Sequence, residues 1–298
     1  MAGGQERVLR RRIKTVQSTK KITRAMELIA SSRIVKAQQR VEASRPYAAQ
    51  LTAAMEDIAR QTGSMVHPLL EERETPAKVG VLVVTSDRGL AGSYNANVLK
   101  VGEELIKGVH ARGLEPVVYV IGKKGVGHFR FRNVPMRGAW QGFSEVPPYE
   151  KAEEVGRTLI EDFGAAEIDE LHCAYTDFRS AFTLRATAKR FLPIAPEEIA
   201  PKTPGAVAAE YLFEPEPAEI LDHLLPQYVI TKVYAAMLES AASENAARRR
   251  AMKAATDNAE DLIKLLSRQA NRARQDEITT EILEIVGGAE ALSAASEG

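Results

Sequence analysis

The chain has 298 residues, of which 45% are hydrophobic and 27% charged, a composition that is typical of a folded protein and excludes a mainly disordered one. Lys plus Arg and Asp plus Glu number 40 each, so no overall basic charge points to a nucleic-acid partner. No apolar run approaches the roughly 20 residues of a membrane-spanning helix, and the single cysteine, Cys173, cannot form a disulfide within the chain.

The N-terminal region is strongly basic. Its only acidic residue is Glu6, which stands among Arg7, Arg10, Arg11, Arg12, Lys14, Lys20, Lys21 and Arg24. An organelle transit peptide has the same charge bias. We favour a mature bacterial chain, because the stretch continues into a long periodic helix without a break that resembles a cleavage site.

A long helix is predicted over about residues 5–62. Small or apolar residues recur in alternating steps of four and three, the heptad pattern of a coiled coil: Ala30, Ile34, Ala37, Val41, Ser44, Ala48, Leu51, Met55 and Ile58. Ile22, Met26 and Ile29 are expected to continue the pattern on a slightly rotated stripe. Pro46 should bend the helix and Gly63 should end it. We therefore assign residues 1–64 to an N-terminal coiled-coil helix.

Residues 75–214 have the pattern of a small α/β domain. Short apolar runs of the buried-strand type lie at 79–84, 116–121 and 168–175, with helical segments near 94–112 and 149–164 between them. This alternation implies right-handed crossovers and a mostly parallel sheet. A loop is then expected at Pro193, Pro196, Pro201 and Pro204, followed by a closing edge strand at Tyr211, Leu212 and Phe213.

Two segments of this domain invite comparison with ligand sites. Residues 122–127 follow a strand but match neither the dinucleotide fingerprint nor a phosphate loop, so a glycine-rich turn is the better interpretation. Residues 85–90 lie at the carboxyl end of the first strand, where α/β sheets often hold ligands, but a turn and a helix cap explain them equally well. The five histidines show no metal-ligand spacing. We expect no catalytic residue, cofactor or metal.

A second long helix is predicted within residues 215–298. It repeats the heptad pattern through Leu238, Ala242, Asn245, Arg249, Met252, Thr256, Ala259, Ile263, Leu266, Ala270 and Ala273, and the apolar stripe continues through Ile278, Ile282 and Ile285. Pro217 and Glu219 predict its start, and Gly287-Gly288 predicts its end. Pro226 is expected to kink it.

The two terminal helices are expected to pair with each other. A compact domain separates them, so an antiparallel arrangement is the simplest. Several seam positions hold alanine, which predicts a thin rod, although each missing methylene forgoes about 0.8 kcal/mol of burial. Such a rod gains stability by lying inside another structure, whereas an ordinary solvent-exposed coiled coil would favour larger seam residues. The expected fold class is α/β plus a long antiparallel coiled coil, with a central Rossmann-like domain containing a small parallel sheet.

Four segments carry a family resemblance that covers nearly the whole chain. Ile22–Ser32, Thr85–Gly92 with Tyr94–Asn97, Ser243–Ala259 and Ile278–Ala289 are similar, in this order, to motifs of F-type ATP synthase gamma subunits. Ala91 departs from the pattern, because many members carry Cys there. The chain also lacks a Cys-bearing insertion of the chloroplast type, so light-linked redox control is not expected.

The resemblance implies a central-stalk rotor subunit that is not itself catalytic. In the family, the coiled coil stands inside a ring of three alpha and three beta subunits, and the α/β domain sits with the epsilon subunit on the membrane ring of c subunits. Rotation couples transmembrane ion flow to conformational changes at the catalytic beta subunits. The implied location is the cytoplasmic face of the bacterial cell membrane, which the chain would reach only through its partners.

The resemblance also implies contact residues. Arg274, Gln275 and Thr279 fall where family members make polar contacts with a beta-subunit loop, and Glu284 lies on the same helix. Met26 falls where the N-terminal helix passes the acidic lever of beta. The same positions can be explained by solvated face charges or, for Met26, by seam packing.

Two other function classes stay open on the residues alone. One is a basic coiled-coil tethering protein or nucleic-acid binder, which would lose its ligand steeply on adding salt. The other is a nucleotide-binding α/β enzyme built on residues 75–214, which would bind nucleotide as an isolated protein.

Overall fold

The computed structural model describes residues 3–62, 67–180, 183–199, 214 and 216–296. Its contacts divide the chain into a terminal unit, residues 1–29 with 249–298, and a central unit, residues 30–248. The two long helices, α1 (Gly3–Thr62) and α6 (Pro217–Ser296), contribute to both units. None of the described helices combines the length and apolar character needed to cross a membrane.

The central unit contains a five-stranded sheet with the strand order β3-β2-β1-β4-β5. Its strands are β1 (Lys78–Val84), β2 (Glu115–Ile121), β3 (Met136–Trp140), β4 (Glu170–Phe178) and β5 (Leu184–Leu192). The pairs β1–β2, β1–β4 and β2–β3 are parallel, and β4–β5 is antiparallel. The prediction of a small, mostly parallel sheet is therefore confirmed, although it missed both edge strands, β3 and β5.

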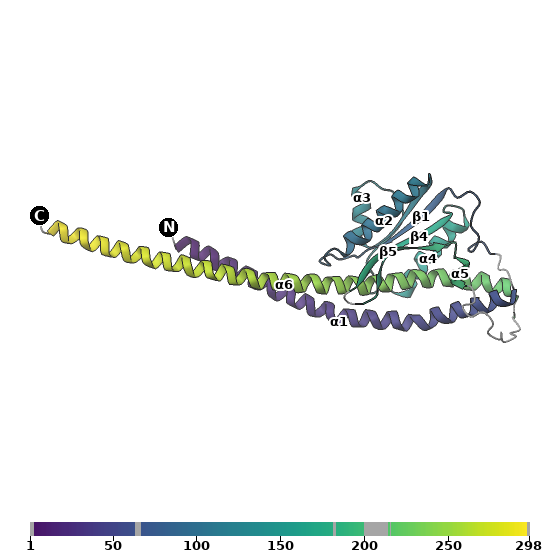
Figure 1. The fold of residues 1–298 in the computed structure, drawn as a ribbon, viewed down its shortest axis with the longest axis horizontal. Helices are drawn as coiled ribbons and strands as arrows, with labels where there is room; N and C mark the ends of the chain where they lie inside the picture. The colour runs from purple at the N-terminus through teal and green to yellow at the C-terminus, as the bar shows by residue number, and fades with distance from the viewer. Residues whose placement is uncertain (1–2, 63–66, 181–182, 200–213, 215, 297–298) are drawn as a thin grey trace. The chain divides into compact units, whose positions relative to one another are not determined.

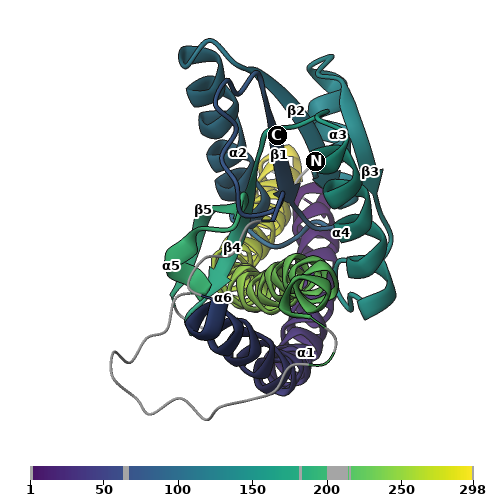
Figure 2. The same ribbon diagram turned by 90° about the vertical axis from the view of Figure 1, so that its right-hand side faces the viewer.

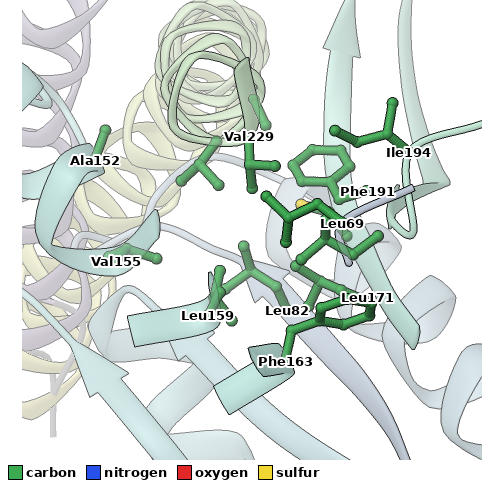
Figure 3. Close-up of a cluster of buried hydrophobic side chains, with 14 of the residues drawn as sticks. Leu69, Leu82, Ala152, Val155, Leu159, Phe163, Leu171, Phe191, Ile194 and Val229 are labelled. Atoms are coloured by element: carbon green, nitrogen blue, oxygen red, sulfur yellow. The ribbon is translucent and has the colours of Figure 1, made fainter. Parts of the chain in front are cut away.

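Helices cover both faces of this sheet (Figures 1 and 2). One face packs on α2 (Tyr94–Ala111) and α3 (Lys123–Phe131), and the other on α4 (Tyr149–Gly164) and α6. Side chains alternate along β1, so that Val81 and Val83 join the first layer while Leu82 and Val84 join the second. Figure 3 shows the second layer, where Leu82 and Leu171 of the sheet meet Leu159 of α4 and Val229 of α6.

Within the central unit, the middle of α6 is enclosed on every side. No residue from 229 to 248 is exposed, as expected for a helix that packs against neighbours all round. Leu51, Met55 and Ile58 of α1 belong to the same apolar cluster as Leu225 and Val229 of α6. α4 lies so close to α6 that a side chain at Gly156 would come within 2.7 Å of Ile230.

The terminal unit is an antiparallel pair of helices. Lys20 Nζ lies 3.0 Å from Glu260 Oε2, and the hydroxyl groups of Thr23 and Thr256 are 2.8 Å apart. Residue numbers thus fall along α6 as they rise along α1, which confirms the predicted pairing. The inward positions of α1 in this unit are half-buried or buried and keep the four-three spacing: Leu9, Ile13, Val16, Lys20, Thr23 and Glu27.

The predicted seams hold, except for one stretch. Ala30, Ile34, Ala37, Leu51, Met55 and Ile58 are buried, and so are Ala242, Met252, Ala259, Leu266 and Ala270. The rotated stripe through Ile22, Met26 and Ile29 is wrong, because Ile22 and Ile29 are 61% and 54% exposed. The seam instead continues in register through the polar residues Lys20, Thr23 and Glu27, which an apolar pattern search does not detect.

Three further expectations need correction. α6 continues past Gly287-Gly288 to Ser296, so the glycine pair does not end the helix. The expected turn at residues 122–127 is the start of helix α3. The expected loop after Pro193 includes a short helix, α5 (Pro196–Ile199).

The expected stop at Gly63 and the edge strand at Tyr211, Leu212 and Phe213 lie outside the described residues. Pro46 and Pro226 lie inside α1 and α6, and the bends expected there stay predictions.

Candidate functional surfaces

The C-terminal part of α6 extends beyond its helical partner. In an antiparallel pair of helices, the residue numbers of two opposite residues have a constant sum. Lys20–Glu260 and Thr23–Thr256 give a sum of about 280, so Gly3, where α1 begins, lies opposite about residue 277. α6 continues from there to Ser296 as a single helix (Figure 1). In isolation, a single helix of this length is marginally stable in water.

Large aliphatic side chains are exposed on this single helix. They are Ile278, Ile282, Leu283, Ile285 and Val286. Folded proteins rarely leave such a dense apolar cluster in contact with water unless another molecule covers it. The neighbouring charges are acidic, namely Asp276, Glu277, Glu281 and Glu284. The surface therefore combines apolar contact area with negative charge.

The predicted contact residues all lie in the terminal unit, but they do not form one cluster. Arg274, Gln275, Thr279 and Glu284 are exposed on α6, and the Thr279 hydroxyl donates to the Gln275 carbonyl oxygen at 2.9 Å. Met26 is half-buried on α1. By the same register it lies opposite about residue 254 of α6, which is roughly 30 Å along the helix from Arg274 at 1.5 Å per residue.

In the central unit, a cluster of ion pairs joins both long helices to the loops of the α/β domain. Glu145, in the loop between β3 and α4, accepts from Arg33 Nη1 of α1 at 2.5 Å and lies 3.4 Å from both Arg88 and Arg248. Arg248 of α6 also donates to Glu244 at 2.5 Å. Burial raises the pKa of Glu244 even though Arg248 opposes that shift.

Asp87 and Ser144 complete this junction. Asp87 accepts from the backbone N–H of Lys123 at 3.0 Å and of Ser144 at 2.9 Å. Burial alone would raise the pKa of Asp87, but these hydrogen bonds hold it below its usual value. Ser144 accepts from Asp87 N–H at 2.8 Å and donates to Glu244 at 3.2 Å. The junction could not be predicted from the sequence, because its members come from four segments that lie far apart in the chain, although two of these segments carry family-like motifs.

The junction fills the crevice in which α/β sheets with this strand order bind ligands. That crevice lies at the carboxyl ends of β1 and β4, where the strand order reverses. Ser243 of α6 donates to the Thr176 carbonyl oxygen there at 3.3 Å. A cavity beside the carboxyl end of β1, between Val84, Ile121 and Glu244, has a volume of about 10 Å³, which is about the room for one water molecule and far too small for a nucleotide.

The requirement for glycine at position 122 is explained by its close packing against Thr85, at the carboxyl end of β1. Its φ of +99° favours glycine, and a side chain there would come within 2.3 Å of the Thr85 carbonyl oxygen. The Thr85 hydroxyl in turn accepts from Gly125 N–H at 2.9 Å. Gly122 and Gly125 thus allow α3 to approach the end of β1 closely, and the backbone N–H of Gly125 already donates to Thr85.

One buried carboxyl group lies where α6 contacts the sheet. The Oε2 atom of Glu239 is buried and has no hydrogen-bond partner among the described residues. Burial and the nearby carboxylate of Asp177 raise the pKa of Glu239 to about 7, while Lys189 opposes the shift. Arg179, 3.2 Å from Asp177, is the other cation of this group. Glu239 is therefore a carboxyl group of the central unit whose charge changes near neutral pH.

Comparison with known proteins gives a consistent family. The family model described as ATP synthase matches residues 5–292. The ATP synthase gamma chain of Acidothermus cellulolyticus is 54% identical over 296 residues, covering 98% of both chains. That of Frankia casuarinae is 54% identical over 294 residues, covering 97% of this chain and 98% of the relative. The gamma chain of Mycolicibacterium smegmatis is 51% identical over 301 residues, covering 96% and 97%.

Solved structures share the fold at low sequence identity. A chain of the Euglena gracilis mitochondrial ATP synthase, from a structure of its OSCP, F1 and c-ring, matches with a TM-score of 0.67 and 16% identity, covering 99% of this chain and 97% of that one. A chain from the central stalk and c-ring of the Tetrahymena thermophila mitochondrial enzyme matches with a TM-score of 0.56 and 20% identity, covering 78% and 99%.

Proposed function

This chain belongs to the family of ATP synthase gamma chains, and from that membership we propose that it couples ion flow to catalysis as the central rotor of an F-type ATP synthase. In this proposal, three alpha and three beta subunits surround the paired helices, and the α/β domain contacts the epsilon subunit and the ring of c subunits. The chain carries no catalytic site of its own. It reaches the cytoplasmic face of the bacterial membrane only through these partners.

The single observation that carries the proposal is the apolar end of α6. Ile278, Ile282, Leu283, Ile285 and Val286 are exposed on a helix that has no helical partner in the chain's described part. Burying each of them fully would contribute about 1.5 to 3 kcal/mol. A ring of surrounding subunits supplies such burial, and an apolar lining lets the helix turn because it forms no directional hydrogen bonds.

The predicted beta-subunit contacts stay part of this proposal. Arg274, Gln275, Thr279 and Glu284 are exposed, so a partner can reach them. No acidic group lies within 4 Å of Arg274 among the described residues, which leaves its guanidinium group available to a carboxylate of beta. Met26 is half-buried, so part of its side chain is open to a partner as well.

The proposed mechanism depends on asymmetry. Two helices with different exposed residues cannot present the same contacts to three equivalent beta subunits. Each beta subunit is therefore biased towards a different conformation, and rotation of the helix pair moves that bias from site to site. We retain residues 1–64, 75–214 and 215–298 as the proposed division into N-terminal helix, α/β domain and C-terminal helix.

Reconstitution with the alpha and beta subunits tests the proposal. We expect ATPase activity to belong to the mixture, and we expect deletion of residues 275–298 to weaken coupling of hydrolysis to ion pumping more than it weakens assembly. The triple variant Ile282→Ser, Leu283→Ser and Ile285→Ser should act in the same direction. Val35→Ser, at an exposed position of α1, is the matched control. Unchanged coupling in the deletion and triple variants would contradict the assignment.

The two alternative functions have less support. The crevice of the α/β domain is filled by α6 and the Asp87 loop, which argues against a nucleotide-dependent enzyme. Part of the basic charge of α1 is paired, as in Lys20–Glu260 between the helices and Arg10–Glu6 and Arg24–Glu27 within α1, so the helix pair does not present a uniformly basic surface to nucleic acid.

A further inference from the structure

The outward face of α3 holds an exposed aromatic ring among unpaired cations. Phe131 is 88% exposed, the highest value for a large apolar side chain in the described part of the molecule. It lies on the same helix face as Lys123, Lys124, Gly127 and Arg130, all of which are exposed. We refer to these five residues as the α3 patch.

The fold does not need Phe131. The inward face of α3 is anchored by Val126 and Phe129, which are 3% and 1% exposed and belong to the core between the sheet and α2. Phe131 lies two residues beyond Phe129 and points away from that core. A ring in this position contributes almost no burial to the isolated chain, which leaves its apolar surface available to another molecule.

The nearby carboxylates are already engaged. Glu103 accepts from His128 at 2.7 Å and forms an ion pair with Arg132. Asp87 accepts from backbone N–H groups and from no side chain of the patch. In the described ranges, no acidic group lies within 4 Å of the side-chain nitrogens of Lys123, Lys124 or Arg130.

The position of the two lysines adds to this imbalance. They stand in the first turn of α3, which contains no acidic residue, and the N-terminus of a helix disfavours positive charge. The patch therefore has an uncompensated positive potential around an apolar ring. Gly127 leaves open space beside the ring, since an added side chain would meet nothing within 4 Å.

We propose that the α3 patch is a docking surface for an acidic segment of a partner protein, in which carboxylates face Lys123, Lys124 and Arg130 and an apolar side chain packs on Phe131. Three cations fall short of the roughly four to eight that mark an electrostatic membrane site, so a protein segment fits better than a lipid surface. This inference rests on the proposed rotor function in one respect only, namely that we expect the partner to be a subunit of the same complex.

Site-specific photo-crosslinking tests this surface. The variant Phe131→p-benzoylphenylalanine, expressed as the sole copy of the chain in intact cells, should crosslink on illumination to one protein segment with net negative charge, identified by mass spectrometry. Adding Lys123→Glu, Lys124→Glu and Arg130→Glu should lower the yield at least fivefold. Lys107→Glu, an exposed unpaired lysine of α2, is the matched control and should leave the yield unchanged.

The outcomes separate this inference from the proposed function. An acidic segment of an ATP synthase subunit supports both, and an acidic segment of an unrelated protein supports the docking surface while counting against the rotor. Four outcomes would each overturn the docking surface. They are a crosslink to lipid, a crosslink to a neutral or basic segment, the absence of any crosslink, and a crosslinking yield that the charge-reversal substitutions leave unchanged. Because all the substituted side chains are exposed, circular dichroism of the purified variants should match that of the parent chain.

Discussion

Glu239 should contribute to the pH dependence of the stability of the central unit. Its pKa is raised from the ordinary value to about 7 by burial and by Asp177. A carboxyl group whose pKa is higher in the folded state binds its proton more tightly there. The stability associated with that proton is therefore fully present below the unfolded value and is lost as the pH rises through about 7.

The variant Glu239→Gln tests this dependence. We expect it to match the parent chain at pH 5 and to exceed it at pH 8 by on the order of 2 kcal/mol, because glutamine carries no charge to bury. The single tryptophan, Trp140 of β3, reports unfolding of the α/β domain by fluorescence in urea. Glu161→Gln, at an exposed position of α4, should leave the curve unchanged. Parallel curves for the parent chain and Glu239→Gln between pH 5 and 8 would contradict the prediction.

Gly122 and Gly127 form a matched pair within one short segment. Gly122→Ala should destabilise the domain by about 2 kcal/mol or more, because the new side chain meets the Thr85 carbonyl oxygen at a positive φ. Gly127→Ala should be neutral or stabilising by up to about 1 kcal/mol, since alanine favours a helix and the space is open. Urea unfolding followed at Trp140 measures both. Equal effects of the two variants would show that the close approach of α3 to β1 is not what requires Gly122.

At the scale of the helix pair, small seam residues should be intolerant of enlargement. Ala242 is fully buried, so Ala242→Leu should cost about 1 to 3 kcal/mol through overpacking. Ala53→Leu makes the same change at an exposed position of α1 and should cost nothing measurable. Chemical denaturation compares the two. A neutral Ala242→Leu would mean that the helices can move apart, and it would remove the argument for a thin rod.

The hydroxyl groups of Thr23 and Thr256 should couple α1 to α6 in the terminal unit. They are 2.8 Å apart, so one hydroxyl donates to the other, and the second donates to a carbonyl oxygen of its own helix, at Lys20 or Met252. A double-mutant cycle with Thr23→Val and Thr256→Val should give a coupling free energy of about 0.5 to 1 kcal/mol, read from amide hydrogen exchange in residues 20–27 and 252–260. Thr19→Val is the control, because that hydroxyl bonds only to its own helix. Additive effects of the two substitutions would show that this pair does not set the register.

The elements that the sequence predicts best are the strongly periodic ones. Both long helices and the three central strands follow from apolar spacing, because burial on one face or on both imposes it. The strands β3 and β5 were not predicted, because edge strands carry exposed polar residues that interrupt the apolar pattern, such as Arg137, Arg185 and Lys189. Helix α3 was not predicted, because its two glycines lower its helix propensity. Burial of Val126 and Phe129 compensates for this only in the folded domain.

At the scale of the whole molecule, the unpaired end of α6 should be the least protected helix in the isolated chain. Residues 280–296 have no helical neighbour within the terminal unit, so their amides should exchange within seconds, while those of residues 229–248 should be protected for far longer. Addition of alpha and beta subunits should protect residues 280–296 by at least tenfold. Continued rapid exchange in the assembled complex would show that nothing encloses this helix.

The functional surfaces were only partly accessible from the sequence. Family motifs point to Arg274, Gln275, Thr279 and Glu284, and their exposure agrees with a contact role without testing it. The junction around Glu145 could not be foreseen, because Arg33, Arg88, Glu145 and Arg248 come together only through tertiary folding. The α3 patch was hidden for another reason, since its aromatic residue becomes conspicuous only once the neighbouring Phe129 is known to be the buried one.

The enclosure of residues 229–248 of α6 has a practical consequence for protein engineering. A minimal version of the chain, reduced to its two long helices, would present Val229, Ile230, Val233 and Met237 directly to solvent. Such a fragment should precipitate or self-associate unless those positions are redesigned with polar side chains. The α/β domain thus covers the apolar side chains in the middle of the C-terminal helix and keeps them from water. The domain and this helix should therefore not be exchanged between homologues as independent modules.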